Sequence, residues 1–146
     1  MAMLWAGYAD AGIGCWNAKF TFSFWRPVTA IQAGGGNPAL VADPSWLPLA
    51  STPSHPEYPA AHGCLTGAVS TILAGYFGTP NITFTVDSLV PNTVPYTFTS
   101  TYELMDQVEM ARIYAGFHYH HSVVEGRVLG MKVGHQVLQR YFGQLK

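Results

Sequence analysis

Charged residues are scarce in this chain of 146 residues. Lys and Arg together number 7 and Asp and Glu number 8, so charged side chains make up 10% of the sequence and the net charge is −1. This balance supplies no basic field that would hold a nucleic acid, and no run of like charges indicates a tail. We therefore expect no nucleic-acid partner, while the apolar content of 49% predicts a globular domain with a substantial core.

Cysteines and long apolar runs are also few. Cys15 and Cys64 are too few for a disulfide framework and too far apart in sequence for a zinc knuckle, so they are interpreted as buried thiols, with a bridge between them as the alternative. The N-terminal segment lacks the basic stretch and unbroken apolar run of a secretory signal. The least charged helical stretch, residues 59–78, is interrupted by His62, threonines and glycines. We expect no membrane span, and the cellular location stays unknown.

The chain does contain the pattern of four helices, of which two lie in its first half. The first is expected to run from near the N-terminus to about Trp25, because Pro27 disfavours helical geometry in the residue before it. The second is expected to begin around Pro59 and to stop before Gly78. Residues 33–59, rich in proline and glycine, form a long loop between them, and ordered loops of this length usually cover or line a site.

Two capping boxes predict the remaining helices, over residues 101–115 and 123–142, with Gly116 closing the first of them. The serine and glutamate pairs are Ser100 with Glu103 and Ser122 with Glu125. Three glycines recur every fourth residue on the last helix and predict a stripe for close helix packing: Gly126, Gly130 and Gly134. With at most short strands before residue 100, the sequence predicts an all-α fold, a helical bundle with long connecting loops, as a single helical domain over residues 1–146.

The placement of the few cations suggests an anion site. Lys19 and Arg26 are seven residues apart, which is about two helical turns or roughly 10 Å, so on one continuous helix both would leave the same face. We expect the pair to clasp one anion. The alternative is that both are surface cations whose stems cover apolar neighbours.

Two histidines can approach the same anion. His62 is predicted in the first turn of its helix, beside unpaired amides and the positive end of the helix dipole, and Ala60 and Ala61 are small enough to let an oxyanion reach that backbone. Arg112 is near the end of the third helix and His118 follows the glycine that breaks it. We expect Arg112 and His118 to face one cavity.

These three groups occur in a recognisable order. Lys19 is followed by Arg26 and Pro27, then by the stretch 59–62, then by Arg112 and His118. The order and spacing resemble the three-part signature of the vanadium-dependent haloperoxidases and the type 2 phosphatidic acid phosphatases. The stretches "FWRPVTAI" and "TPSHPEYPAAHG" are more similar to the haloperoxidase branch. The resemblance spans residues 10–134 and implies the C-terminal half of the haloperoxidase fold.

The resemblance implies a cofactor and a role for each matched residue. The bound group would be vanadate, or phosphate in the same site. His118 would be the metal ligand of a peroxidase or the phosphorylated nucleophile of a phosphatase, and His62 the acid and base on the other side. The oxyanion-binding residues would be Lys19, Arg26, Ala60, Ala61 and Arg112. The implied substrates are hydrogen peroxide and a halide, or a phosphate ester.

The sequence departs from the family pattern in three respects. Ala60 stands where the family commonly has a serine that bonds the anion, and the loss of one such donor weakens a site by on the order of 1–3 kcal/mol. Ser122 stands where many members have an aspartate that orients the nucleophilic histidine, with Asp10 and Glu57 as possible substitutes. The chain is also several times shorter than haloperoxidases usually are. We expect a homo-oligomer or a missing N-terminal half, because lost helices would leave apolar faces bare.

Other interpretations of the same residues stay open. The site would also serve an acid phosphatase that works through a phosphohistidine intermediate, an inactive phosphate-binding remnant, or a helical interaction module. The "HYHH" stretch offers His118, His120 and His121 as ligands for zinc or copper, without a local carboxylate or cysteine to complete the set. His55 and His135 are interpreted as a loop and a helix-surface residue.

Overall fold

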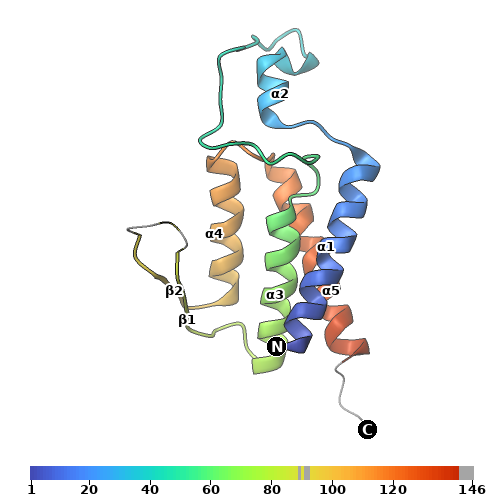
Figure 1. Ribbon diagram of the computed structural model, residues 1–146, viewed down its shortest axis with the longest axis vertical. Helices are drawn as coiled ribbons and strands as arrows, with labels where there is room; N and C mark the ends of the chain where they lie inside the picture. The colour runs from blue at the N-terminus through green and yellow to red at the C-terminus, as the bar shows by residue number, and fades with distance from the viewer. Residues whose placement is uncertain (89, 91–92, 142–146) are drawn as a thin grey trace.

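The computed structural model describes residues 1–88, 90 and 93–141. Its main elements are four long helices, which run alongside one another with a short helix and the long loop above one end (Figure 1). The bounds are α1 Ala2–Phe22, α2 Pro27–Gln32, the 3-10 turn η1 Gly34–Gly36, α3 Ala61–Phe77, β1 Phe84–Val86, β2 Tyr96–Phe98, α4 Thr101–Tyr114 and α5 His120–Arg140. The predicted all-α helical bundle is confirmed.

The first helix ends earlier than predicted. Ser23 adopts the left-handed conformation (φ 44°) and its N–H donates to Lys19 O at 2.8 Å, which closes α1 at Phe22. Pro27 does not end a helix but begins one, because its fixed φ suits the first position of α2 after the extended residue Arg26. The chain therefore turns between the two helices instead of continuing in one.

The later helix boundaries follow their capping residues. Gly78 (φ 70°) closes α3 at Phe77 as predicted, and Ser100 Oγ accepts from Glu103 N at 3.0 Å at the start of α4. The second capping box is wrong. The helix α5 already begins at His120, and Ser122 lies inside its first turn, where its hydroxyl makes a different bond described below.

Close packing of α3 against α5 forms the centre of the bundle. A Cβ atom on Gly63 would lie 2.8 Å from Val123 O, and one on Gly67 would lie 2.7 Å from Arg127 O, so both positions of α3 require glycine. The predicted stripe on α5 is confirmed, since Gly126, Gly130 and Gly134 face backbone atoms of α3 or of the residue before it. Because the two backbones are in direct contact, the ends of α3 and α5 have little room to move relative to each other.

The remaining elements cover this pair. Cys15 of α1 packs with Ala61 and Cys64 of α3, and both cysteines are buried free thiols, so the bridge is not formed. Residues 84–86 and 96–98 pair as an antiparallel hairpin in the segment where only short strands were predicted, with Thr85 opposite Thr97. Within the described residues, no helix combines the length and apolarity needed to cross a bilayer.

Candidate functional site

The predicted site residues lie at one end of the bundle. There α1 and α4 end, α3 and α5 begin, and the chain crosses to α2 (Figure 1). Lys19 is in the last turn of α1, His62 in the first turn of α3, and Arg112 in the last turn of α4. The unpaired amides of α3 and α5 point toward the same end and make it attractive to anions.

Lys19 is fully buried and bonded to the long loop. Its Nζ donates to Pro56 O at 2.8 Å and to Glu57 O at 3.0 Å. Burial lowers the pKa of Lys19 to about 8, with the positive charge of Arg26 lowering it further and the neighbouring thiols and Glu57 opposing the shift. Lys19 therefore holds the loop in place and brings positive charge to the site at neutral pH.

Arg26 reaches the site by a different route from the one predicted. Because α1 ends at Phe22, Arg26 is not on the helix face of Lys19, and the same-face argument is wrong. Its guanidinium instead enters from the turn before α2. Nε and Nη2 donate to His55 O at 3.2 and 3.0 Å, and Nη1 donates to Phe117 O at 2.9 Å. The two cations converge through tertiary structure.

His118 is held between a carboxylate and the guanidinium of Arg26. Its Nδ1 lies 2.7 Å from Glu57 Oε1, and its Nε2 lies 3.2 Å from Arg26 Nη1. Because arginine only donates, Nε2 is the acceptor and Nδ1 carries the proton. Desolvation lowers the pKa of His118, assisted by Arg26 and opposed by the bond to Glu57, so the ring is neutral with its lone pair on Nε2.

Glu57 is the carboxylate of the site, and the sequence indicated it only as one of two substitutes for the family aspartate. It is fully buried and also accepts from Tyr119 N at 3.0 Å and from Ser122 Oγ at 2.6 Å. Burial opposes its ionisation, but the hydrogen bonds from His118, Ser122 and Tyr119 outweigh burial and lower the pKa of Glu57. Asp10, the other substitute, is exposed on α1.

Arg112 lies over the Phe117 ring, with its guanidinium carbon 4.4 Å from the ring centroid. Its buried Nε finds no hydrogen-bond acceptor among the described residues. The charge of Arg112 lowers the pKa of His62, His55 and Arg26, which places it in the same electrostatic environment as these groups. A buried donor without an acceptor is unusual and fits a site for an anion.

The backbone before α3 offers fewer amides than expected. Ala60 N donates to Ser122 O at 2.9 Å, so this N–H is occupied within the protein. Ala61 is the first residue of α3, and first-turn amides have no intrahelical acceptor. His62 follows with an exposed side chain, and desolvation of its ring together with the charge of Arg112 lowers its pKa to about 4.

His55 belongs to the site, although the sequence indicated only a loop residue. Its Nδ1 lies 3.1 Å from Arg26 Nη2, and its ring packs on Trp16 with centroids 5.2 Å apart. The signal that could have found it was its position in the same short stretch as Glu57 and His62.

The "HYHH" metal cluster is not formed in the described part of the chain, where no three potential ligands converge, and His121 stacks on Tyr58 instead.

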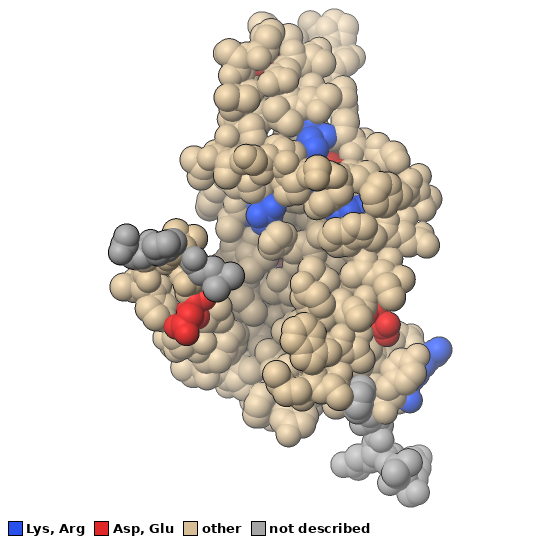
Figure 2. Space-filling view, in the orientation of Figure 1, with Lys and Arg blue, Asp and Glu red and all other residues tan. Residues whose placement is uncertain are grey.

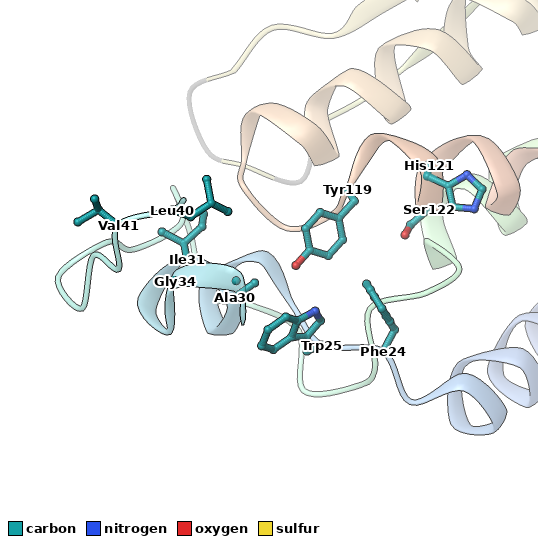
Figure 3. Close-up of a pocket in the computed structure, with 11 residues that line it drawn as sticks. Phe24, Trp25, Ala30, Ile31, Gly34, Leu40, Val41, Tyr119, His121 and Ser122 are labelled. Atoms are coloured by element: carbon teal, nitrogen blue, oxygen red, sulfur yellow. The ribbon is translucent and has the colours of Figure 1, made fainter. Parts of the chain in front are cut away.

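An apolar pocket of about 590 Å³ lies beside this cluster, between α2 with its following loop and the start of α5 (Figure 3). Its lining is Phe24, Trp25, Ala30, Ile31, Gly34, Gly35, Leu40, Val41, Tyr119, His121 and Ser122. None of the three site cations lines it. Ser122 and Tyr119, which bind Glu57 on one side, thus border the pocket on the other. Elsewhere the face seen in Figure 2 is mostly uncharged, with Lys and Arg atoms showing in a few places in its upper half and at its lower right edge.

These features define a class of protein: an all-α bundle with a cluster of cations and histidines at one end, suited to a small oxyanion. The family model of the VCPO second helical-bundle domain matches residues 1–145, so the chain belongs to this family of haloperoxidase-like proteins. It is 35% identical over 78 residues to the vanadium chloroperoxidase of Curvularia inaequalis, a match that covers 47% of this chain and 12% of that protein.

Solved structures give the same fold. A bacterial vanadium-dependent iodoperoxidase is 33% identical and superposes with a TM-score of 0.80 over 90% of this chain and 30% of its own length. A bacterial vanadium-dependent chloroperoxidase in its holo form is 21% identical, with a TM-score of 0.73 over 92% of this chain and 35% of its own. The chain thus spans about a third or less of the proteins that it matches.

Proposed function

We propose that this chain carries the oxyanion site of a vanadate-dependent haloperoxidase, which oxidises a halide with hydrogen peroxide. The observation that carries the proposal is the state of His118: a buried neutral imidazole whose Nδ1–H is fixed by Glu57 and whose Nε2 lone pair faces a guanidinium. Membership of the haloperoxidase-like family supports the same reading. In the relatives, the part that matches this chain is about a third of the protein, so the proposed activity is that of a longer protein.

The residues present fit vanadate. Three cations, Lys19, Arg26 and Arg112, offset the negative charge of an oxyanion, and the unused Nε of Arg112 supplies a donor. His118 Nε2 would be the metal ligand, since a neutral imidazole fixed through its other nitrogen is the usual form of such a ligand. When bound, vanadate supplies the Lewis acidity that activates peroxide toward a halide. No cluster of hard carboxylate ligands is required.

The protein's own part is charge, position and proton transfer. His62, neutral above about pH 4, accepts a proton from hydrogen peroxide on a ring nitrogen and returns it to the oxygen that leaves as water. Overall the peroxide O–O bond breaks, the halide loses two electrons to the peroxide oxygens, and one further proton from solvent completes the products, so that hydrogen peroxide, halide and a proton give hypohalous acid and water. Lys19 fixes the loop that supplies Glu57, and the Ala61 amide donates to an oxyanion oxygen.

The test is halide oxidation by the protein supplied with vanadate and hydrogen peroxide. We expect iodide- or bromide-dependent oxidation, read with a phenolic dye, that is lost in His118→Ala and retained in His135→Ala, a matched change on the exposed surface of α5. Circular dichroism shows that both variants fold. A folded wild-type chain that does not bind vanadate would overturn the proposal.

A phosphatase is the second candidate, because a fixed Nδ1–H and a lone pair on an unprotonated Nε2 suit a nucleophile as well as a metal ligand. His118 Nε2 would attack the phosphorus of a phosphate monoester while His62 protonates the leaving oxygen, and His62 would then activate water to hydrolyse the phosphohistidine. Hydrolysis of p-nitrophenyl phosphate that vanadate merely inhibits would select this function. Tight phosphate binding without turnover would select the inactive remnant.

A further inference from the structure

Glu57 is a fully buried carboxylate that accepts hydrogen bonds from three different residues. Oε1 accepts from His118 Nδ1 at 2.7 Å and from Tyr119 N at 3.0 Å, and Oε2 accepts from Ser122 Oγ at 2.6 Å. His118 and Tyr119 lie directly before α5, and Ser122 lies in its first turn. The carboxylate itself comes from the loop before α3, 61 residues earlier in the chain.

Ser122 stands at the position where the resemblance expects an aspartate that orients the histidine. The serine cannot accept from His118, because the Nδ1 proton is already bonded to Glu57 and the serine hydroxyl points its own proton at Oε2. We propose that Glu57 is the positioning residue of this site: it replaces the aspartate from another element and fixes the His118 ring, with Ser122 locking the carboxylate. This inference rests on the proposed function of the site as an oxyanion site.

The backbone of Glu57 is anchored independently of its side chain. Its N–H donates to Phe24 O at 2.9 Å, and its carbonyl accepts from Lys19 Nζ at 3.0 Å. A substitution at this position therefore removes the carboxylate while keeping the main-chain bonds that hold the loop. The role of the side chain can be separated from the folding of the loop.

The first arm of the test examines the ring of His118 directly, by nitrogen-15 NMR of the protein without added anion. Wild type is expected to show a single tautomer with the proton on Nδ1. Glu57→Ala should keep this form through Arg26 but leave the Nδ1 proton without its acceptor, so that it exchanges faster with water, whereas Glu57→Gln keeps an acceptor oxygen and should retain slow exchange. Glu125→Gln, a change on α5 away from these bonds, is the matched control. An unchanged exchange rate of the Nδ1 proton in folded Glu57→Ala would overturn the proposal.

The second arm measures vanadate and inorganic phosphate affinity by calorimetry. Glu57→Gln should bind vanadate roughly 10–100-fold more weakly than wild type, the usual effect of losing the charged partner of a ligating histidine. Ser122→Ala, which frees Oε2, should weaken binding by a smaller factor. An unchanged affinity in Glu57→Gln together with a lowered melting temperature would assign Glu57 a purely structural role.

The sharpest arm moves the carboxylate to the position where the family has it. Ser122→Asp alone should bind vanadate more weakly than wild type, because two carboxylates would then face each other at hydrogen-bond distance. The double variant Glu57→Ala with Ser122→Asp should recover affinity to within a few-fold of wild type. If the double variant binds no better than Glu57→Ala, the positioning role is contradicted.

The two proposals fail in different ways. If wild type binds neither anion, the proposed function fails, and the NMR arm still decides whether Glu57 fixes the ring. If wild type binds vanadate and the Glu57 variants are indistinguishable from it in both arms, the proposed function stands and the role of Glu57 fails.

Discussion

At the scale of single residues, His62 shows how position on a helix and neighbouring charge prepare a proton acceptor. Its ring is exposed in the first turn of α3, and desolvation with the charge of Arg112, then of His118, His55 and Lys19, lowers its pKa to about 4. An imidazole with this pKa stays neutral in mildly acidic solution. It can therefore accept a proton over a wider pH range than an ordinary histidine.

We predict that an NMR titration of His62 gives a pKa near 4 rather than its ordinary 6.5. Arg112→Gln removes the positive charge with the largest effect on His62 and should raise the pKa of His62 toward the ordinary value. Arg140→Gln, a change of the same kind at the exposed end of α5, should leave it unchanged. If the pKa of His62 is the same in Arg112→Gln as in wild type, the charge of Arg112 does not contribute to the shift.

The same residue predicts how stability depends on pH. The pKa of His62 is lower in the folded state, about 4, than in the unfolded state, 6.5, so between these values the unfolded state binds more protons. The free energy of unfolding should therefore fall as the pH falls from 6.5 to 4. Urea unfolding at several pH values measures this slope. His62→Gln should reduce the slope of the free energy of unfolding against pH. The slope that remains comes in part from His55 and His118, whose pKa values are also lowered.

At the scale of elements, the contact of α3 with α5 sets the distance between the two loops that carry the site. His62 lies in the first turn of α3 and His118 lies two residues before the start of α5, so the separation of the imidazoles depends on how closely the two helix backbones approach at the glycines. A Cβ atom on Gly130 would collide with Cys64 O, which is backbone and cannot rotate away. Any added side chain must push the helices apart.

Gly130→Ala is expected to lower the free energy of unfolding by roughly 1–3 kcal/mol, the usual cost of overpacking a core. Gly14→Ala is the matched control, since no atom lies within 4 Å of the added Cβ and alanine favours a helix. Chemical denaturation of both variants measures the difference. Equal stabilities would mean that the helices can separate without cost.

Much of the bundle could be predicted from local signals, and the site only in part. Capping and breaking residues such as Ser100 and Gly78 act through their own backbone, so the sequence shows where those helices begin and end. The roles of Ser122 and Glu57 depend on a contact across 65 residues, which no local pattern contains. The break after Phe22 was missed because proline both ends and begins helices, and only tertiary packing decides which.

At the scale of the whole molecule, α1 is apolar on two sides. Its buried side carries Cys15 and Lys19, while a second stripe of large apolar side chains is bare, including Trp5 at 64%, Ile13 at 70% and Phe20 at 62% exposure. A helix that is hydrophobic all round is normally buried on all sides. This stripe is where either a second copy or the remainder of a longer haloperoxidase-like protein would pack.

We predict that the chain, as given, self-associates at micromolar concentration through this stripe, since its net charge of −1 offers little repulsion. Light scattering after size exclusion should show an assembly larger than one chain. Ile13→Glu with Phe20→Glu should shift it to the monomer, while Tyr114→Glu, on an exposed site of α4, should not. A monomeric wild-type chain would contradict the prediction.

The guanidinium of Arg26 has another consequence. Its N–H groups already meet protein acceptors, which are the carbonyl oxygens of His55 and Phe117 and the Nε2 atom of His118. Capture of an anion at His118 is therefore an exchange of partners, and its affinity is a difference between two sets of bonds. A guest with formal negative charge is favoured over an uncharged one in this exchange, because charge-assisted hydrogen bonds are stronger than neutral ones.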